Sequence, residues 1–185
     1  MPHFHTPAVE ALSSDASELR EHIRDVTGRD PSPLFGALLL RPDLARPLFE
    51  WFVAVMMTDG RLGRPLKEMI ATRVSFANAC RYCSALHAYR AEAAGVSRDV
   101  IDRLADPIDQ LPVDTRDRML MSFCDKARDA SSTIVEQDWA TLRDAGWEDE
   151  AILEAAHVVG MFSHFNRLAD AVGVEFTPPP SAPAG

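Results

Sequence analysis

The spacing of apolar residues is the feature that most limits what this chain can form. Apolar side chains recur every three or four residues from Val9 to Val172, as they do on the buried face of an amphipathic helix. No stretch alternates apolar and polar side chains among β-branched residues for long enough to predict a strand. We therefore predict an all-α fold, a single domain of helices packed around one core.

Glycine, proline and capping residues divide this pattern into successive helices. The predicted helices are Val9–Val26, Leu34–Leu40, a segment from Asp43 through Val55, Leu66–Asn78, Ala79–Ala94, a short one capped by Ser97, Asp114–Ala130, Glu136–Ala145 and Glu148–Val172. We expect residues 1–33 to form a helical extension and residues 34–176 to form the main domain. The proline-rich tail 177–185 has too few apolar residues to bury and is expected to be disordered.

Composition narrows the class of protein. Nineteen basic residues against 28 acidic ones give a net charge of −9, which argues against nucleic-acid or anionic-membrane binding. The longest apolar runs, Leu34–Leu40 and Trp51–Met57, are too short to span a bilayer, and the first ten residues do not resemble a secretory signal. Three cysteines fit a reducing compartment better than a disulfide scaffold. These features predict a soluble, cytoplasmic protein.

Two cysteines and a histidine share one face of a predicted helix. Cys80, Cys83 and His87 fall within an arc of about 60° at 100° per residue. Asn78 is a good N-cap, which would place both cysteines near the helix N-terminus, where backbone N–H groups favour a thiolate. His87 is then within reach of Cys83 and can take its proton.

The preceding helix supplies a carboxylate. On one straight helix Glu68 and Cys80 would lie about 18 Å apart, too far for contact. A break near Ala77–Asn78 would fold the Glu68 helix back, so that its carboxylate could orient His87.

Such a dithiol suits peroxide reduction. A thiolate at Cys83 can attack a hydroperoxide and become a sulfenic acid, with which Cys80 condenses to a disulfide. A reductant then restores both thiols. The assignment of Cys83 as the attacking thiol and Cys80 as the resolving one rests on His87 being nearer Cys83.

Other interpretations of the same residues remain open. A C-x-x-C pair can be half of a zinc site, with His87 and one of Cys124, His157 or His164 completing it, although no second C-x-x-C or H-x-x-x-H follows. The cysteines could also be inert core residues. Cys124 is expected in the core, and His157 and His164 are interpreted as packing histidines, with a place in the pocket wall as the alternative.

The segment Arg61–His87 resembles the AhpD-like, peroxidase-related branch of the carboxymuconolactone decarboxylase family. It contains a glutamate, eleven residues, C-x-x-C, three residues and a histidine, and weaker likeness extends from Leu34 to Phe176. The resemblance implies an AhpD-like helical bundle that assembles as a trimer or hexamer. It also implies a peroxidatic Cys83, a resolving Cys80, and a proton relay of His87 and Glu68. One departure is Tyr82, which stands where the best-studied relative has a histidine.

The resemblance implies an oxidoreductase that acts on a small organic hydroperoxide, without metal, haem or flavin. Its expected protein partner is a thiol or lipoyl-bearing reductant, as in the best-studied relative. Two other functions compete with this one: the lactone decarboxylation that names the family, and a redox-responsive binding module in which the disulfide changes a contact surface. The decarboxylation needs no dithiol, so the Cys80–Cys83 pair counts against it.

Overall fold

The computed structural model describes residues 7–178, and within them the chain is helical with no strand, which confirms the predicted all-α fold. The α-helices of this part of the chain are α1 (Ser14–Thr27), α2 (Pro33–Leu38), α3 (Pro42–Phe52), α4 (Arg64–Ala77), α5 (Arg81–Ala93), α6 (Arg98–Asp102), α7 (Thr115–Asp129), α8 (Glu136–Asp144) and α9 (Asp149–Val172). Short 3₁₀ turns lie at Val9–Ala11, Ile108–Gln110 and Ser131–Thr133, and a π-helical turn, Val53–Met57, extends α3.

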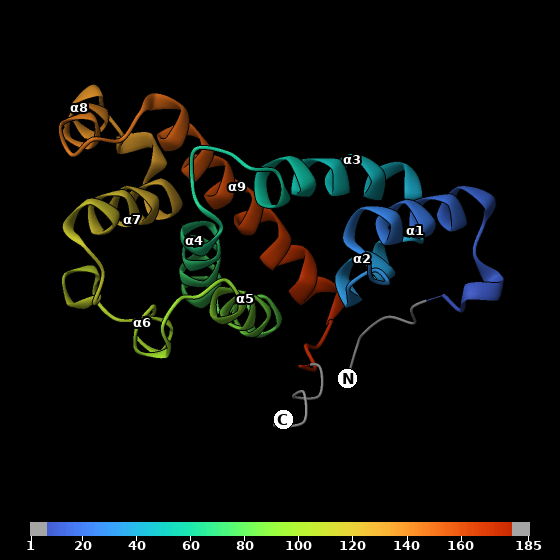
Figure 1. Cartoon of the computed structure of the whole chain (residues 1–185). Coiled ribbons are helices and arrows are strands. Elements are labelled where there is room, and N and C mark those ends of the chain that lie inside the picture. The colour runs from blue at the N-terminus through green and yellow to red at the C-terminus, as the bar shows by residue number, and fades with distance from the viewer. Residues whose placement is uncertain (1–6, 179–185) are drawn as a thin grey trace.

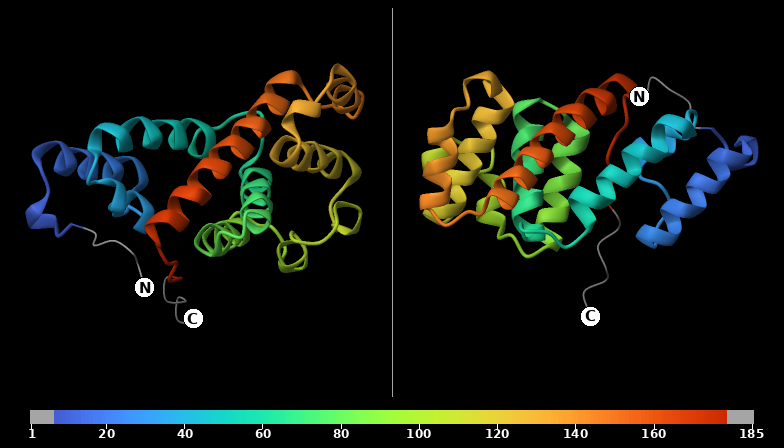
Figure 2. Two further views of the ribbon diagram at one scale, coloured as in Figure 1. Left: turned by 180° about the vertical axis from the view of Figure 1, so that it is seen from behind. Right: turned by 90° about the horizontal axis from the view of Figure 1, so that it is seen from above.

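Helix α9 crosses the middle of the molecule (Figure 1). Helices α1 to α3 lie on one side of it and α7 and α8 on the other, while α4 and α5 form a hairpin near the centre (Figures 1 and 2). α9 packs against α4, α5 and α7, and also against α2. Leu19 of α1, Ile70 of α4 and Ile152 of α9 are all buried in the same core, so the N-terminal helices are part of one packed unit.

The first helix begins later than the sequence pattern predicts. The predicted helix started at Val9, but α1 starts at Ser14, because the Ser13 hydroxyl accepts the backbone N–H of Ala16 and caps the helix there. Val9–Ala11 form a separate 3₁₀ turn, and Leu12 is extended. The division of the chain at residues 33 and 176 stays a prediction. Of the expected disordered tail, residues 179–185 lie outside the described part of the chain.

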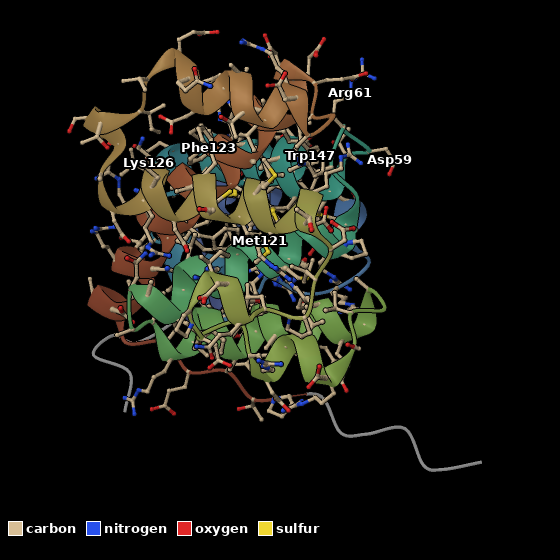
Figure 3. The ribbon with its side chains drawn as sticks, turned by 90° about the vertical axis from the view of Figure 1, so that its left-hand side faces the viewer. Asp59, Arg61, Met121, Phe123, Lys126 and Trp147 are labelled. Atoms are coloured by element: carbon tan, nitrogen blue, oxygen red, sulfur yellow. The ribbon has the colours of Figure 1, made fainter. Side chains whose placement is uncertain are left out.

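Helices α7 and α8 pack through one aromatic and one charged pair. Figure 3 looks onto the α7 side of the molecule, with Phe123 and Lys126 labelled. Phe123 meets Trp139 edge to face at 6.0 Å, and the Lys126 ammonium lies 2.7 Å from the Asp138 carboxylate. These contacts attach α8 to the core on the side away from α1.

A buried lysine fixes the loop that leads into α4. Lys67 is only 2% exposed, and its Nζ lies 2.5 Å from Oε1 of Glu154 on α9. The other Glu154 oxygen accepts the backbone N–H groups of Arg61 and Leu62, at 2.7 and 3.0 Å. Gly60 passes so close that a Cβ there would lie 2.1 Å from Glu154 Oε1. One carboxylate thus neutralises a buried cation and satisfies two loop donors.

Glu154→Ala is expected to lower the free energy of unfolding by about 3 kcal/mol, because it leaves the Lys67 ammonium buried and unpaired. Urea denaturation followed by circular dichroism measures this change. Glu92→Ala removes an exposed glutamate whose one ion pair among residues 7–178 is with Arg98, at 3.7 Å, and it should leave the midpoint unchanged. Equal midpoints for the two variants would show that Glu154 does not have this role.

Candidate functional site

The turn between α4 and α5 places the cysteine pair. The backbone N–H of Cys80 donates to Ser75 O and that of Ala79 to Phe76 O, both at 3.0 Å, in the pattern of a Schellman helix end. Ala79 takes the left-handed conformation with φ 57°, a position that usually belongs to glycine. The chain reverses at this point, and α5 runs back along α4.

The predicted cap at Asn78 is wrong. Asn78 ends α4, and Cys80 itself is the N-cap of α5. Its Sγ accepts the backbone N–H of Cys83 at 3.3 Å, so the sulfur takes the place that a serine or aspartate oxygen usually occupies. The predicted break between the helices is present, but the helix N-terminus acts on Cys80 more directly than on Cys83.

Glu68 and His87 meet across the α4–α5 hairpin. Oε2 of Glu68 lies 2.6 Å from Nδ1 of His87, and Oε1 lies 2.6 Å from Nη2 of Arg64. Both Glu68 and His87 are almost fully buried. Nineteen residues separate them, and only the reversal at Ala79 brings them together.

The protonation states of this pair follow from burial and charge. Burial alone would raise the pKa of Glu68, but His87 and Arg64 outweigh it and hold the pKa below its usual value. Burial lowers the pKa of His87 despite the neighbouring carboxylate. We therefore assign a carboxylate to Glu68 and a neutral imidazole to His87, whose Nδ1–H donates to the carboxylate. Its Nε2 is then an acceptor.

The two sulfurs differ in acidity. Cys80, Cys83 and the distant Cys124 are free thiols, and all three are buried. Hydrogen bonds from the Cys83 thiol and backbone N–H lower the pKa of Cys80. The pKa of Cys83 is raised, because its thiol donates to the Cys80 sulfur and because it is buried. In the resting dithiol the negative charge thus favours Cys80, and Cys83 holds its proton more tightly.

A cavity of about 340 Å³ opens onto Cys83 and His87. Cys80 is not among its lining residues, so of the two sulfurs only that of Cys83 contributes to its wall. The His87 ring meets Phe162 edge to face at 4.3 Å. We call this space the aromatic cavity; its other walls come from α1, α2, α3 and α9, and its aromatic lining residues are Phe35, Phe49, Phe52, Tyr82, Phe162 and Phe165.

Sequence reasoning missed two arginines at this site. Arg64 precedes Glu68 by four residues, and Arg90 follows His87 by three, so each has the spacing of a neighbour on the same helix face. This spacing could have identified both. No comparable signal marks Ile23, Thr27 or Pro33, which line the cavity from the N-terminal segment.

The histidines of α9 are not packing residues, which corrects that interpretation. His157 and His164 are both exposed, and neither lines the aromatic cavity. His157 lies edge-on to Trp51 at 6.5 Å. Cys124 is buried as expected, and burial raises the pKa of its thiol.

Two further properties of residues 7–178 bear on the other interpretations. No three His, Cys, Asp or Glu side chains there are grouped so that they could hold a metal ion, and so the predicted alternative of a zinc site has no ligand cluster in this part of the chain. No helix in the same range is long and apolar enough to cross a membrane.

Comparisons with known proteins identify the family. The model of the carboxymuconolactone decarboxylase family matches residues 42–109. The alkylhydroperoxidase AhpD core from Ralstonia eutropha JMP134, described as a peroxidase-related protein, is 30% identical; the match covers 93% of this chain and 90% of that one, with a TM-score of 0.83. A peroxidase-related protein from Silicibacter sp. TM1040 is 26% identical over the same shares, with a TM-score of 0.81.

A more distant likeness shows the fold alone. The debrominase Bmp8, solved in complex with 2,3,4-tribromopyrrole, is 17% identical; the match covers 95% of this chain and 93% of that one, with a TM-score of 0.74. A comparison with curated proteins found no match. The family match, the likeness to the Ralstonia protein over most of both chains and the all-α fold agree with one another. This chain belongs to the carboxymuconolactone decarboxylase family, and within it to the AhpD-like, peroxidase-related proteins.

Proposed function

We propose that the protein is a thiol-dependent hydroperoxide reductase in which Cys83 is the peroxidatic and Cys80 the resolving cysteine. The observation that carries the proposal is that Cys83 and His87 line one apolar cavity, with Glu68 hydrogen-bonded behind His87. The family's peroxidase-related members support the reaction class. An apolar cavity of this size suits the alkyl or aryl part of an organic hydroperoxide.

In the first step the neutral imidazole of His87 takes the proton of the Cys83 thiol. The thiolate attacks the terminal oxygen of the hydroperoxide, an S–O bond forms and the O–O bond breaks. The alkoxide leaves with the proton that His87 returns, as an alcohol. Two electrons pass from sulfur to the peroxide, and Cys83 becomes a sulfenic acid. The Glu68 carboxylate stabilises the transient imidazolium.

In the second step the Cys80 sulfur attacks that of Cys83. Its lowered pKa makes Cys80 a thiolate more readily than an ordinary thiol. The Cys83 thiol donates a hydrogen bond to the Cys80 sulfur, so the two sulfurs that would form the disulfide are neighbours. The S–S bond forms, the S–O bond breaks, and the hydroxide leaves with a proton as water. An external dithiol, such as a reduced lipoyl group on a partner protein, then supplies two electrons and two protons. We also propose that the chain assembles as a homo-oligomer, either a trimer or a hexamer.

The test is product formation with a defined peroxide. Pre-reduced protein, cumene hydroperoxide and excess dihydrolipoamide should yield one 2-phenyl-2-propanol for each peroxide consumed, measured by liquid chromatography. Cys124→Ser is the matched control, since Cys124 lies outside the cavity, and it should keep the wild-type rate. Alcohol formation no faster than in the dihydrolipoamide blank would contradict the proposal.

A second reaction fits one specific observation. The structural neighbour Bmp8 is named a debrominase and was solved with 2,3,4-tribromopyrrole. In the present chain one thiol of the C-x-x-C pair, that of Cys83, lines a cavity walled by aromatic rings, which could hold a bromoaromatic ring. The corresponding reaction converts a bromoaromatic and the dithiol into the debrominated ring, the Cys80–Cys83 disulfide and hydrogen bromide. Bromide release from tribromopyrrole, with no alcohol formed from cumene hydroperoxide, would favour it over peroxide reduction.

A further inference from the structure

Arg90 places a positive charge in the wall of the aromatic cavity. It lies on α5, seven residues after Cys83, and its guanidinium is 5.7 Å from the centre of the Phe52 ring. Within residues 7–178 its side chain makes no hydrogen bond or ion pair, although burial lowers its pKa. A guanidinium has five N–H donors, and no side-chain nitrogen of Arg90 is among the buried atoms that lack a hydrogen-bond partner, so water or a ligand can reach them. The Arg90 side chain lines the cavity, so a ligand bound there can accept hydrogen bonds from it.

The surroundings of Arg90 are positive. It also lines a second cavity of about 390 Å³, which shares Thr27, Arg29 and Phe52 with the aromatic cavity. Arg29 and Arg64 line this outer cavity as well, and no aspartate or glutamate does. The chain as a whole has a net charge of −9, whereas the lining of this outer cavity contains three arginines and is therefore positively charged.

The neighbouring carboxylates already have partners. Glu68 is bound by Arg64 and His87, and Asp30, in the wall of the aromatic cavity, lies 2.6 Å from Arg20. The Arg29 side chain, like that of Arg90, makes no hydrogen bond or ion pair within the described residues. Within the described residues neither guanidinium pairs with a carboxylate, although the charge of Glu68 acts on Arg90 and opposes the effect of burial on its pKa. Both side chains can therefore accept an anion as a direct partner.

We propose that the hydroperoxide substrate carries a carboxylate, which Arg90 binds with Arg29 beside it while the peroxide group reaches Cys83. The seven residues from Cys83 to Arg90 correspond to a rise of about 10 Å along α5, so an apolar body separates the two ends of the substrate. That body lies among the phenylalanine rings of the cavity. This inference rests on the proposed function and adds the substrate class. Arg29 comes from the N-terminal segment, outside the family match.

A matched pair of peroxides tests the proposal. Cumene hydroperoxide and its 4-carboxylate derivative differ only in the charged group. The rate of single-turnover oxidation is measured on pre-reduced protein without any reductant, so it reports the peroxide step alone. A difference in rate between the two peroxides then cannot come from binding of a carboxylate on the reductant. We expect the carboxylate to react about 10- to 100-fold faster with the wild type, the gain typical of a charge-assisted hydrogen bond.

Arg90→Gln should bring the ratio of the two rates close to one, and Arg90→Lys, which keeps the charge, should give an intermediate ratio. Arg98→Gln removes an exposed arginine on α6 and should leave both rates unchanged. Equal rates for both peroxides in the wild type, or a full preference in Arg90→Gln, would overturn the carboxylate proposal and leave peroxide reduction standing. Reaction with neither peroxide would overturn the proposed function itself.

Discussion

Cys83→Ser is expected to reduce peroxide turnover by a factor on the order of 10³ or more, because it removes the nucleophile. A serine hydroxyl cannot be oxidised to a sulfenic acid equivalent, and the remaining thiol of Cys80 does not line the aromatic cavity. Steady-state alcohol formation from cumene hydroperoxide measures the loss. The substitution changes one buried atom, and the thermal unfolding midpoint reports whether the fold is kept.

Two further variants show whether the loss of peroxide turnover is specific to removal of the Cys83 thiol. Cys124→Ser, also a buried thiol on a helix, should retain full turnover. Cys80→Ser should lose steady-state turnover too, since no disulfide forms, yet it should still complete one turnover. A Cys83→Ser protein that turned over peroxide at the wild-type rate would refute the proposed role of this thiol.

Glu68→Gln is expected to slow Cys83 oxidation by about 10²- to 10³-fold. The Glu68 carboxylate raises the proton affinity of the otherwise neutral His87, and it stabilises the imidazolium that forms when Cys83 gives up its proton. Glutamine can still accept the Nδ1–H of His87, so the orientation of the ring is kept while the negative charge is lost. The effect is therefore electrostatic.

The pH dependence separates this role from a structural one. In the wild type the rate should fall with acid only below pH 6.5, because burial holds the pKa of His87 under its usual value and protonation removes the base. Without the Glu68 charge that pKa drops further, so the acid limb should move to lower pH while the plateau rate falls. Stopped-flow oxidation from pH 5 to 9 measures both changes.

Thr72→Val is the matched control for Glu68→Gln. Thr72 is buried one turn further along α4, and its hydroxyl donates to the backbone oxygen of Glu68, not to the carboxylate. The carboxylate is untouched, so the rate and its pH profile should match the wild type. If Glu68→Gln also kept the wild-type acid limb and plateau, the relay would have no role.

The sequence was enough to predict the fold class and to single out the four candidate residues. Helical spacing depends on short-range geometry, and it predicted every long helix to within a few residues except at the start of α1. The break between Glu68 and Cys80 was also predictable, since on one straight helix the Glu68 carboxylate would lie too far from Cys80 and His87 to contact them. The catalytic roles of Glu68, Cys80, Cys83 and His87 stay predictions, although the structure brings Glu68 and His87 into contact.

The remaining features depend on contacts that local patterns do not show. Nothing in the sequence marks Ala79 as left-handed, because alanine disfavours that conformation and only the packing of α5 on α4 imposes it. The same turn makes Cys80 a cap in place of Asn78, and this lowers the pKa of Cys80 while the pKa of Cys83 is raised, a difference that the sequence did not predict. The cavity could not be predicted, because its walls come from helices that are far apart in the sequence: α1 and α2 on one side, and α5 and α9 on the other.

The central claim is that Cys83 attacks the peroxide and that Cys80 reacts only afterwards, as the resolving thiol. Trapping the sulfenic acid on Cys83 tests this claim most directly. Reduced Cys80→Ser protein is treated with one equivalent of cumene hydroperoxide, and its mass is measured intact and after digestion. The expected result is a gain of one oxygen, about 16 Da, on the peptide that contains Cys83, with one alcohol released per chain. No gain of oxygen at Cys83, together with oxidation of Cys80 in the Cys83→Ser protein, would contradict it.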